Sequence, residues 1–232
     1  MLVTRPEEDS GSTAARLRDM GHVPIVASLL EVRFRDGPEL ALENIQAVVA
    51  TSANGVRAFT RRSARRDLPV FAVGAQTAAM ARASGFADVR NSDGDSIVLA
   101  DAIVHWASAH RGALLHAAGN EASGKLAARL SEHGFQLRRE VLYDVASVER
   151  LPAIAQAALE RGELDAVLLY SPRSAETFVR CVEDAGLSSA CRNIIAVCIS
   201  KAAADRAKAL PFRELRIAGL PSENELLESL SR

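Results

Sequence analysis

VVATSANGVRAF (residues 48–59) and VLLYSPRSAETF (residues 167–178) share one pattern, and this pattern decides the fold of the chain. Each stretch is an apolar, β-rich run, followed by a short polar turn with Ser and then by the apolar spacing of a helix. Two further pairs follow in the same order: VFAVGAQTAA (70–79) with IIAVCISKAA (194–203), and VRNSDGDSIVLADAI (89–103) with LRIAGLPSENELLES (215–229). The chain therefore contains an internal repeat of strand–helix units.

The fourth unit of the first copy finds its partner at the front of the chain. ALLHAAGNEASGKLAARLSEHG (113–134) has no counterpart after residue 229. LVTRPEEDSGSTAARLRDMG (2–21) carries Ala-Ala-Arg-Leu and a helix-ending Gly at the same offsets. A repeat that wraps around in this way predicts two similar lobes, one continuous and the other built from both chain ends. Function is expected where the two lobes face each other.

The strand and helix patterns predict the architecture of each lobe. Fully apolar strands that alternate with amphipathic helices are typical of a parallel sheet covered on both faces. LLEVRFRDG (29–37) and REVLYDVASVE (139–149) instead alternate apolar and polar residues, as exposed antiparallel strands do. We predict an α/β fold with two similar lobes, each a parallel sheet flanked by helices, joined by a two-stranded β connector. The predicted boundaries are 1–33 plus 148–232 for the discontinuous lobe, 38–140 for the continuous lobe, and 31–37 and 141–149 for the connector strands.

The bulk composition excludes several classes of partner. The 28 Lys and Arg residues balance 29 Asp and Glu residues, so no basic field points to nucleic acid or to an anionic membrane. The three cysteines lack CxxC spacing and indicate reduced thiols in a cytosolic protein. The N-terminus is too charged for a signal peptide, and no apolar run approaches the length that spans a membrane. We expect a soluble cytoplasmic protein with neither nucleic acid nor membrane as a partner.

The turns that follow the predicted strands are the candidate binding sites. In an open parallel sheet, ligands bind outside the carboxyl ends of the strands, where helix N-termini present unpaired N–H groups. These turns are rich in Ser, Thr, Asn and Gly, with Arg or Lys in three of them, which suits an anionic ligand. The same residue types are ordinary helix caps, so only the set as a whole indicates a site. The candidate binding residues are Arg5, Thr51, Ser52, Gly74, Thr77, Gly119, Asn120, Ser171, Ser200 and Lys201.

Common catalytic signatures are missing from the sequence. GxGxxG after a strand, GxxxxGK[ST], HExxH and GxSxG are all absent. The five histidines are scattered, which favours surface or core roles over metal ligation, and only His116, at a strand end, is a candidate site residue. If the protein is an enzyme, it is expected to work without a metal, a nucleotide cofactor or an activated nucleophile.

Short motifs in a fixed order give the chain a resemblance to a known family. They are Val3-Thr4-Arg5-Pro6, Thr51-Ser52 with Gly55-Val56, Val73-Gly74 with Thr77-Ala78, Gly119-Asn120, Tyr143, and Ser171-Pro172 with the helix to Phe178. Over essentially its full length the chain resembles the uroporphyrinogen-III synthase family. The resemblance implies two lobes joined by a two-stranded ladder, in agreement with the repeat.

The resemblance also implies a reaction. The family's substrate is hydroxymethylbilane, a linear tetrapyrrole with eight carboxylates, which loses its terminal hydroxyl to give an azafulvene. The far ring attacks through its substituted carbon, and the resulting spiro intermediate fragments and recloses with that ring inverted. The bilane cyclises unaided to the uninverted isomer, so the enzyme's task is mainly positioning, and no cofactor is needed. One general acid would suffice. The resemblance assigns this role to Tyr143, which we expect on an exposed connector of a monomeric protein.

The second-lobe turn departs from the family pattern, and other functions stay open. The family commonly has Gly-x-x-Thr where this chain reads Cys198-Ile199-Ser200-Lys201, so Ser200 or Lys201 would contact a substrate carboxylate instead. The main alternative is a non-catalytic two-lobed binding protein for an anionic small molecule, which would share the polar turns but would not need Tyr143. A paired receiver-like signalling module is disfavoured because no strand end carries clustered acids.

Overall fold

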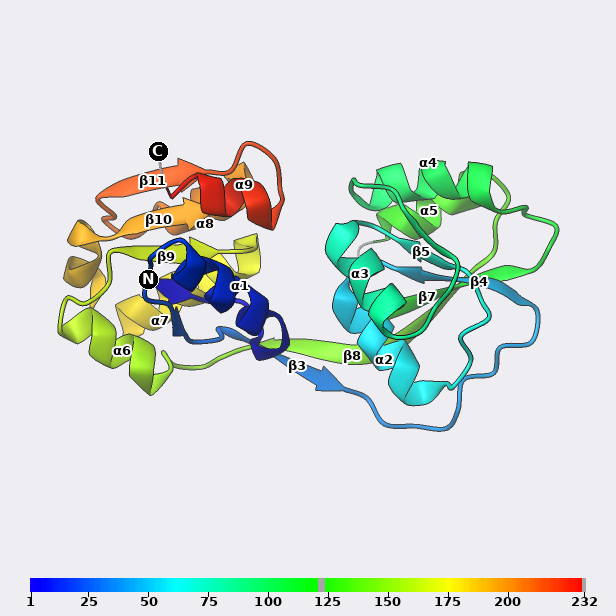
Figure 1. Ribbon diagram of the computed structural model, residues 1–232, viewed down its shortest axis with the longest axis horizontal. Coiled ribbons are helices and arrows are strands. Elements are labelled where there is room, and N and C mark those ends of the chain that lie inside the picture. The colour runs from blue at the N-terminus through cyan, green and yellow to red at the C-terminus, as the bar shows by residue number, and fades with distance from the viewer. Residues whose placement is uncertain (121–123, 231–232) are drawn as a thin grey trace. The chain divides into compact units, whose positions relative to one another are not determined.

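The structure is a computed structural model that describes residues 1–120 and 124–230. The chain forms two compact units (Figure 1): unit 1 is Met1–Glu31 with Ala146–Arg232, and unit 2 is Val32–Val145. Each unit is an α/β layer structure with its own core. The predicted boundaries, 1–33 plus 148–232 and 38–140 for the lobes and 31–37 and 141–149 for the connector strands, stay a prediction.

Unit 2 is built on a sheet with the strand order β3-β8-β7-β4-β5-β6, in which the pairs from β8 to β6 are parallel. Each of the strands β4, β5, β6 and β7 leads into a helix, as the alternating sequence pattern predicts. The elements are β3 (Leu30–Phe34), β4 (Ile45–Ala50), α2 (Ala53–Arg62), β5 (Val70–Ala72), α3 (Ala75–Ala83), β6 (Val89–Asn91), α4 (Ser96–Trp106), β7 (Ala113–Gly119), α5 (Lys125–Glu132) and β8 (Leu137–Ser147).

Unit 1 is built on a parallel sheet with the strand order β11-β10-β9-β1-β2. The strands β1 and β2 come from the start of the chain, and β9, β10 and β11 come from its end. The elements are β1 (Leu2–Val3), α1 (Glu7–Asp19), β2 (Ile25–Val26), α6 (Ala153–Glu160), β9 (Ala166–Leu169), α7 (Pro172–Asp184), the 3₁₀ helix η1 (Ser188–Asn193), β10 (Ile195–Cys198), α8 (Lys201–Ala207), β11 (Glu214–Ile217) and α9 (Glu223–Glu228).

The two sheets have matching strand orders, as the wrapped repeat predicts. In the sheet of unit 2, β5 and then β6 lie on one side of β4, and β7 and then β8 lie on the other. In unit 1, β9 is followed by β10 and β11 on one side and by β1 and β2 on the other. The strand from the N-terminus therefore occupies the place that β7 holds in unit 2. The prediction of two similar α/β lobes with helix-covered parallel sheets is confirmed.

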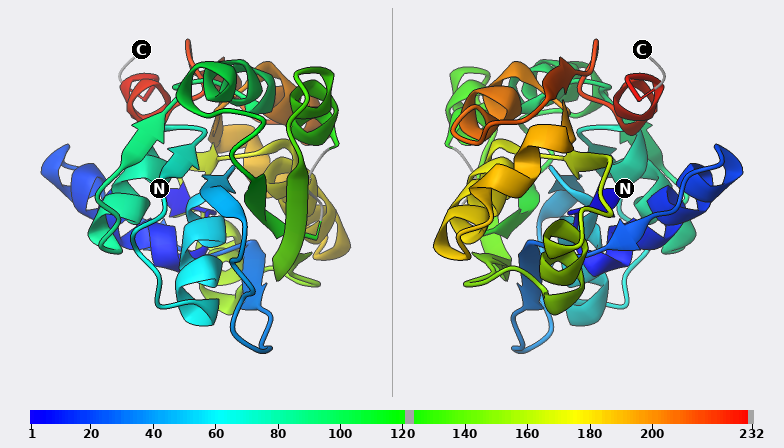
Figure 2. Two further views of the ribbon diagram at one scale, coloured as in Figure 1. Left: turned by 90° about the vertical axis from the view of Figure 1, so that its right-hand side faces the viewer. Right: turned by 90° about the vertical axis from the view of Figure 1, so that its left-hand side faces the viewer.

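Alternation along the central strands divides each core between the two faces of its sheet. In β4, Val48 and Ala50 pack with residues of α2 and α3, whereas Ala47 and Val49 pack with residues of α4 and α5. In β9, Val167 packs on the side of α6, α7 and α8. The opposite face of that sheet is covered by α1 and α9, visible in blue and red in the right view of Figure 2. Apolar residues on both faces explain why these strands read as continuous apolar runs.

The strand β8 is more than a connector. Its residues from Leu137 to Tyr143 pair in parallel with β7, so it extends the sheet of unit 2. It also borders β3. The N–H of Arg35 donates to the carbonyl of Leu142, and the N–H of Val148 donates to the carbonyl of Leu29. The later residue of one segment thus contacts the earlier residue of the other, so β3 and β8 run in opposite directions, as expected for the connector. The expectation of an exposed strand is wrong at Tyr143, because pairing with β7 buries it.

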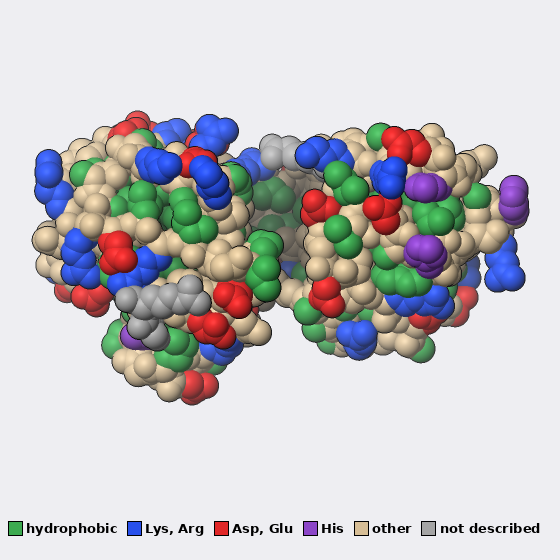
Figure 3. Space-filling model, turned by 90° about the horizontal axis from the view of Figure 1, so that it is seen from above, with side chains coloured by type: hydrophobic (Ala, Val, Ile, Leu, Met, Phe, Trp, Pro, Cys, Tyr) green, Lys and Arg blue, Asp and Glu red, His purple; other side chains and the backbone are tan. Residues whose placement is uncertain are grey.

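The surface charges are mixed, as the nearly equal numbers of basic and acidic residues predict, and the described cysteines are free thiols. On the face shown in Figure 3, Lys and Arg side chains lie among Asp and Glu side chains, and neither sign forms a large patch. Among the described residues, no helix combines the length and apolar character needed to cross a membrane. Cys181, Cys191 and Cys198 are free and buried, and burial raises the pKa of Cys191 to about 11 and that of Cys198 to about 12. These thiols are inert core residues.

Candidate functional site

The structure brings six predicted binding residues of unit 2 to one edge of its sheet. Because β7, β4 and β5 are parallel neighbours, the turns after them lie at the same edge. Ser52 is the N-cap of α2, where its Oγ accepts from the N–H of Gly55 at 3.3 Å, and Gly74 is the N-cap of α3. The residues at this edge are Thr51 and Ser52 after β4, Gly74 and Thr77 after β5, and Gly119 and Asn120 at the end of β7.

The hydroxyl of Tyr143 reaches this edge from β8. Tyr143 lies beside Gly119 in the parallel pairing, after a register shift between Ala118 and Gly119. Its side chain is 6% exposed, and its hydroxyl lies 2.8 Å from the Oγ of Ser52. A buried phenol at hydrogen-bond distance from a helix-capping hydroxyl has a fixed position. Tyr143 and Ser52 therefore form one polar pair.

Gly119 makes room for the tyrosine ring. A Cβ at this position would lie 2.9 Å from two carbons of the Tyr143 ring, which is closer than real contacts allow. The need for glycine here is a matter of space. Gly119 therefore acts through Tyr143 rather than through a turn conformation.

The environment of Tyr143 keeps its phenol protonated. Burial raises its pKa above the usual value, and this effect outweighs the hydrogen bond to Ser52 and the contact with the Gly119 backbone, which lower it. A phenol with a raised pKa is neutral at physiological pH. It can therefore donate a proton to an oxygen bound nearby, and the Ser52 hydroxyl can then donate a hydrogen bond to the phenolate.

The sequence indicates His116 only through the expectation that it ends a strand, which is wrong, because β7 continues to Gly119 and His116 lies in its middle. It is 2% exposed, and its Nε2 lies 3.2 Å from the Oγ1 of Thr51. Burial, and then the positive charge of Arg139, lower the pKa of His116 to about 4. The imidazole is therefore neutral at physiological pH and holds the Thr51 hydroxyl as an uncharged partner.

Asn120 has a structural role at this edge. Its N–H donates to the carbonyl of Tyr143 at 3.1 Å, and its side-chain oxygen accepts from the N–H of Val145 at 3.3 Å. The guanidinium of Arg139 donates to the carbonyls of Gly119 and Asn120. These contacts tie the end of β7 to β8. Asn120 thus supports the position of Tyr143, although its side chain is exposed.

In unit 1, Ser171 and Ser200 take equivalent places after β9 and β10. Ser171 caps α7 and forms a reciprocal capping box with Ser174. Ser200 caps α8, where its Oγ accepts from the N–H of Ala203 at 3.3 Å. Lys201 is exposed, and its ammonium pairs with Asp205 at 3.2 Å on the same helix. The edge of unit 1 thus repeats the capped helix starts of unit 2 but offers no phenol–hydroxyl pair among these residues.

Arg5 differs from the other predicted binding residues because its charge is already paired. It follows β1 and is 6% exposed. Its Nη1 lies 3.0 Å from Thr13 Oγ1 and 3.0 Å from Glu223 Oε1. Its guanidinium carbon lies 4.7 Å from the centre of the Tyr170 ring. The chain's own carboxylate therefore occupies Arg5 in this structure.

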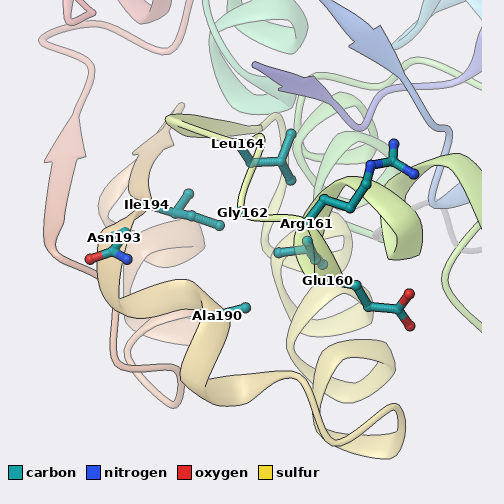
Figure 4. A pocket seen from close by; sticks show the side chains of 8 residues that line it. Glu160, Arg161, Gly162, Leu164, Ala190, Asn193 and Ile194 are labelled. Atoms are coloured by element: carbon teal, nitrogen blue, oxygen red, sulfur yellow. The ribbon is translucent and has the colours of Figure 1, made fainter.

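A cavity at the opposite edge of unit 1 lacks the features of a binding site. It has a volume of about 280 Å³ and lies where β9 and β10 begin, between Leu164 and Ile194 (Figure 4). Its Arg161 is engaged by Glu163 at 2.7 Å. Polar turns and helix N-termini are concentrated at the other edge of the sheet. Among the described residues, no group of three or more His, Cys, Asp or Glu could hold a metal ion.

Comparison with known proteins gives consistent relatives. The family model described as uroporphyrinogen-III synthase HemD matches residues 11–228. The curated porphyrin biosynthesis protein HemD of Ruminiclostridium josui is 28% identical over 228 residues, which are 92% of this chain and 44% of that protein. This chain therefore spans less than half the length of that relative.

Two solved structures share the fold. Uroporphyrinogen-III synthetase from Helicobacter pylori superposes with a TM-score of 0.65 at 20% identity, over 90% of this chain and 92% of that one. A mutant uroporphyrinogen III synthase from Thermus thermophilus superposes with a TM-score of 0.54 at 15% identity, over 100% of this chain and 97% of that one. These likenesses agree with the α/β architecture. Because the family model matches nearly the whole sequence, the chain belongs to the uroporphyrinogen-III synthase family.

Proposed function

We propose that this chain catalyses the cyclisation of hydroxymethylbilane to uroporphyrinogen III, with loss of water and inversion of the last pyrrole ring. Family membership supports the reaction, and the observation that carries the assignment to a site is the buried Tyr143–Ser52 pair. A neutral phenol at the polar edge of a parallel sheet is suited to donate a proton to a departing hydroxyl. We propose this reaction for the 232 residues of this chain alone.

In the proposed mechanism, Tyr143 acts as the general acid. Its hydroxyl protonates the terminal hydroxyl of the bilane, the carbon–oxygen bond breaks, and water and a protonated azafulvene result, with a phenolate left on Tyr143. The far ring attacks the azafulvene carbon through its substituted position, and the spiro intermediate fragments and recloses with that ring inverted. The ring carbon finally loses one proton, which restores the phenol. The sum is bilane to macrocycle plus water, with no oxidant or reductant.

Ser52 is proposed to assist Tyr143 without being a nucleophile. Either hydroxyl of the pair can be the donor, so the Ser52 hydroxyl can donate a hydrogen bond to the phenolate that remains after Tyr143 gives up its proton. Ser52 also caps α2, which fixes its Oγ relative to the helix. Burial raises the pKa of Tyr143 and makes a phenolate costly there, and the hydrogen bond from Ser52 lowers that cost.

The carboxylates of the substrate are proposed to lie at the helix starts. The helices α2, α3 and α7 carry no acidic residue in their first turn. Unpaired N–H groups there attract carboxylates without a high density of formal charge. Thr51, Thr77 and Ser171 would add hydroxyl donors beside these N–H groups. We also propose that the protein acts as a monomer in the cytoplasm; its free, buried cysteines support the reducing compartment.

Isomer analysis of the product tests the proposal. Freshly made hydroxymethylbilane is incubated with the protein, and the products are oxidised and separated into type I and type III uroporphyrin. The type III isomer is expected to dominate with protein, and the type I isomer without it. The reaction is run with and without a chelator, and no difference is expected. An unchanged isomer ratio from a folded sample would instead favour a binding protein without catalytic activity.

A further inference from the structure

We propose that unit 1 contains a carboxylate-binding site, formed by Arg5 and Tyr170, whose occupant in this structure is the side chain of Glu223. A carboxylate of the ligand takes the place of Glu223 when it binds. The identity of the ligand rests on the proposed function, but the site itself follows from the contacts of these three residues.

The cluster combines buried charges with groups from distant parts of the chain. Arg5 follows β1, Tyr170 follows β9 and Glu223 begins α9. Arg5 and Glu223 form an ion pair at 3.0 Å, and their side chains are 7% and 24% exposed. The Thr13 hydroxyl also contacts Glu223. Because β1 and β9 are parallel neighbours, Arg5 and Tyr170 lie at the carboxyl edge of the sheet, where ligands of such folds bind.

One carboxylate does not satisfy every donor in this cluster. The Nε of Arg5 and the hydroxyl of Tyr170 are buried and have no hydrogen bond of normal geometry within the described part of the chain. The Arg5 guanidinium lies against the Tyr170 ring, so the two unmatched donors belong to one small region. Buried donors without acceptors are uncommon and destabilising. An additional acceptor is the group that would satisfy them.

Burial of Arg5 dictates how a ligand must enter. Without Glu223 the buried guanidinium would keep only the longer ion pair with Asp9, at 3.8 Å, so the departure of Glu223 is unfavourable unless another carboxylate arrives. Such an exchange keeps the charge of the cluster unchanged. The arriving carboxylate can use the fork of the guanidinium and the Tyr170 hydroxyl together. A ligand with carboxylates on short flexible arms, as in a polycarboxylate tetrapyrrole, meets this requirement.

Glu223 can leave without unfolding the helix that carries it. Its side chain is 24% exposed, compared with 7% for Arg5 and 11% for Asp9, and its second ion pair, with Arg16 at 3.6 Å, is to a side chain that is 42% exposed. The preceding loop includes Leu220, which is 64% exposed. By contrast, Leu226 and Leu227 of α9 are buried in the core of unit 1. A rotation of the Glu223 side chain is therefore enough, while α9 stays in place.

The exchange makes Glu223 an internal competitor. A binding-competent site that is mostly occupied by the chain's own carboxylate has a reduced apparent affinity for an external one. Removing the charge of Glu223 should therefore strengthen ligand binding, whereas a purely structural ion pair would give no gain. This contrast separates the two roles of Glu223.

The test is calorimetric titration of the folded protein with uroporphyrin III, a stable octacarboxylate. The Glu223→Gln variant is expected to bind about three- to thirtyfold more tightly than the wild type. Glu228→Gln is the matched control, because it makes the same charge change at an exposed position of the same helix. It is expected to change affinity less than about twofold, through screened long-range charge alone. Adding Arg5→Lys to Glu223→Gln should abolish the gain, because lysine lacks the guanidinium fork.

Equal or weaker binding by Glu223→Gln than by Glu228→Gln would overturn the proposal, as would a wild type that binds no uroporphyrin III. Thermal unfolding is recorded for each variant. If Glu223→Gln does not fold, Glu223→Asp takes its place. It keeps the charge but withdraws the carboxylate, and an intermediate gain in affinity is expected. Unchanged affinity of Glu223→Asp would likewise contradict the exchange. The isomer assay reports the proposed activity separately, so one proposal can fail while the other stands.

Discussion

Gly119 and Tyr143 face each other across the parallel pairing of β7 and β8, and the tyrosine ring fills the space where a glycine side chain is absent. This relationship explains how a residue of the connector strand reaches the polar edge of unit 2. It also makes the tyrosine position sensitive to a single methyl group on its neighbour.

Gly119→Ala should therefore lower both stability and turnover. The added Cβ would lie 2.9 Å from the ring and would push Tyr143 away from Ser52. Overpacking of this kind costs about 1–3 kcal/mol of the free energy of unfolding. Urea unfolding and steady-state rates would measure the two effects. Gly124→Ala is the matched control, because no atom lies within 4 Å of a Cβ placed there. Equal behaviour of the two variants would argue against the tight contact.

Tyr143→Phe should lower turnover by about ten- to a thousandfold, the usual range for one positioned general acid. Folding and affinity for uroporphyrin III should stay nearly unchanged, because the ring still packs beside Gly119 and only the bond to Ser52 is lost. Single-turnover rates and calorimetric titration separate the two quantities. Wild-type turnover in this variant would mean that another group, or a carboxylate of the substrate, supplies the proton.

Ser171→Ala and Thr51→Ala should act mildly. Backbone N–H groups at the starts of α7 and α2 would still contact the substrate carboxylates after either hydroxyl is removed. We expect the KM to rise by less than about tenfold for each, the worth of one neutral hydrogen bond. Initial rates over a range of substrate concentrations would show this. Loss of all activity in either variant, with the fold retained, would place the chemistry at that hydroxyl.

His116 should make the stability of the protein depend on pH. Its pKa in the folded protein, about 4, lies below the usual value of 6.5, so below pH 6.5 the unfolded chain takes up a proton that the folded protein does not. Its contribution is fully present above pH 6.5 and is lost as pH falls toward 4. The loss amounts to roughly 2–3 kcal/mol of the free energy of unfolding.

Urea unfolding between pH 7 and pH 4.5 would measure this contribution. His116→Gln, which can keep a hydrogen bond to Thr51, should remove most of the pH dependence in that range. His133→Gln is the control, since His133 is exposed at the end of α5. An identical pH dependence for wild type and His116→Gln would contradict the proposed titration.

The sequence predicts the fold well because the repeat contains topological information. Matching motifs such as those around Ser52 and Ser171 fix the equivalent strands, and the displaced fourth unit predicts that β1 lies beside β9. The helix-capping role of both serines also follows from local residue preferences. The caps depend on neighbouring residues in the chain, whereas the place of β1 follows from the repeat.

Contacts between distant residues could not be predicted in the same way. The alternation in β8 shows a strand but not its pairing with β7, so the burial of Tyr143 was missed. The ion pair of Arg5 with Glu223 joins residues 218 positions apart, and no local pattern marks it. His116 lies in the middle of β7, not at the strand end that the sequence predicts, and no local pattern marks its contact with Thr51. The roles of the predicted binding residues and of Tyr143 stay predictions until the variants are measured.

The position of β1 inside the sheet of unit 1 also sets an order of events during synthesis. Val3 of β1 pairs with Leu168 of β9, so β1 cannot take its place between β2 and β9 until the residues up to β9 have been synthesised. Unit 2 ends at Val145, so all of its residues are synthesised before β9, and it can fold while β1 still lacks that partner. Pairing over so long a sequence separation is slow, because the entropy of closing a large loop is lost before the contacts form. Residues 32–145 are therefore expected to become protease-resistant before residues 1–31 do.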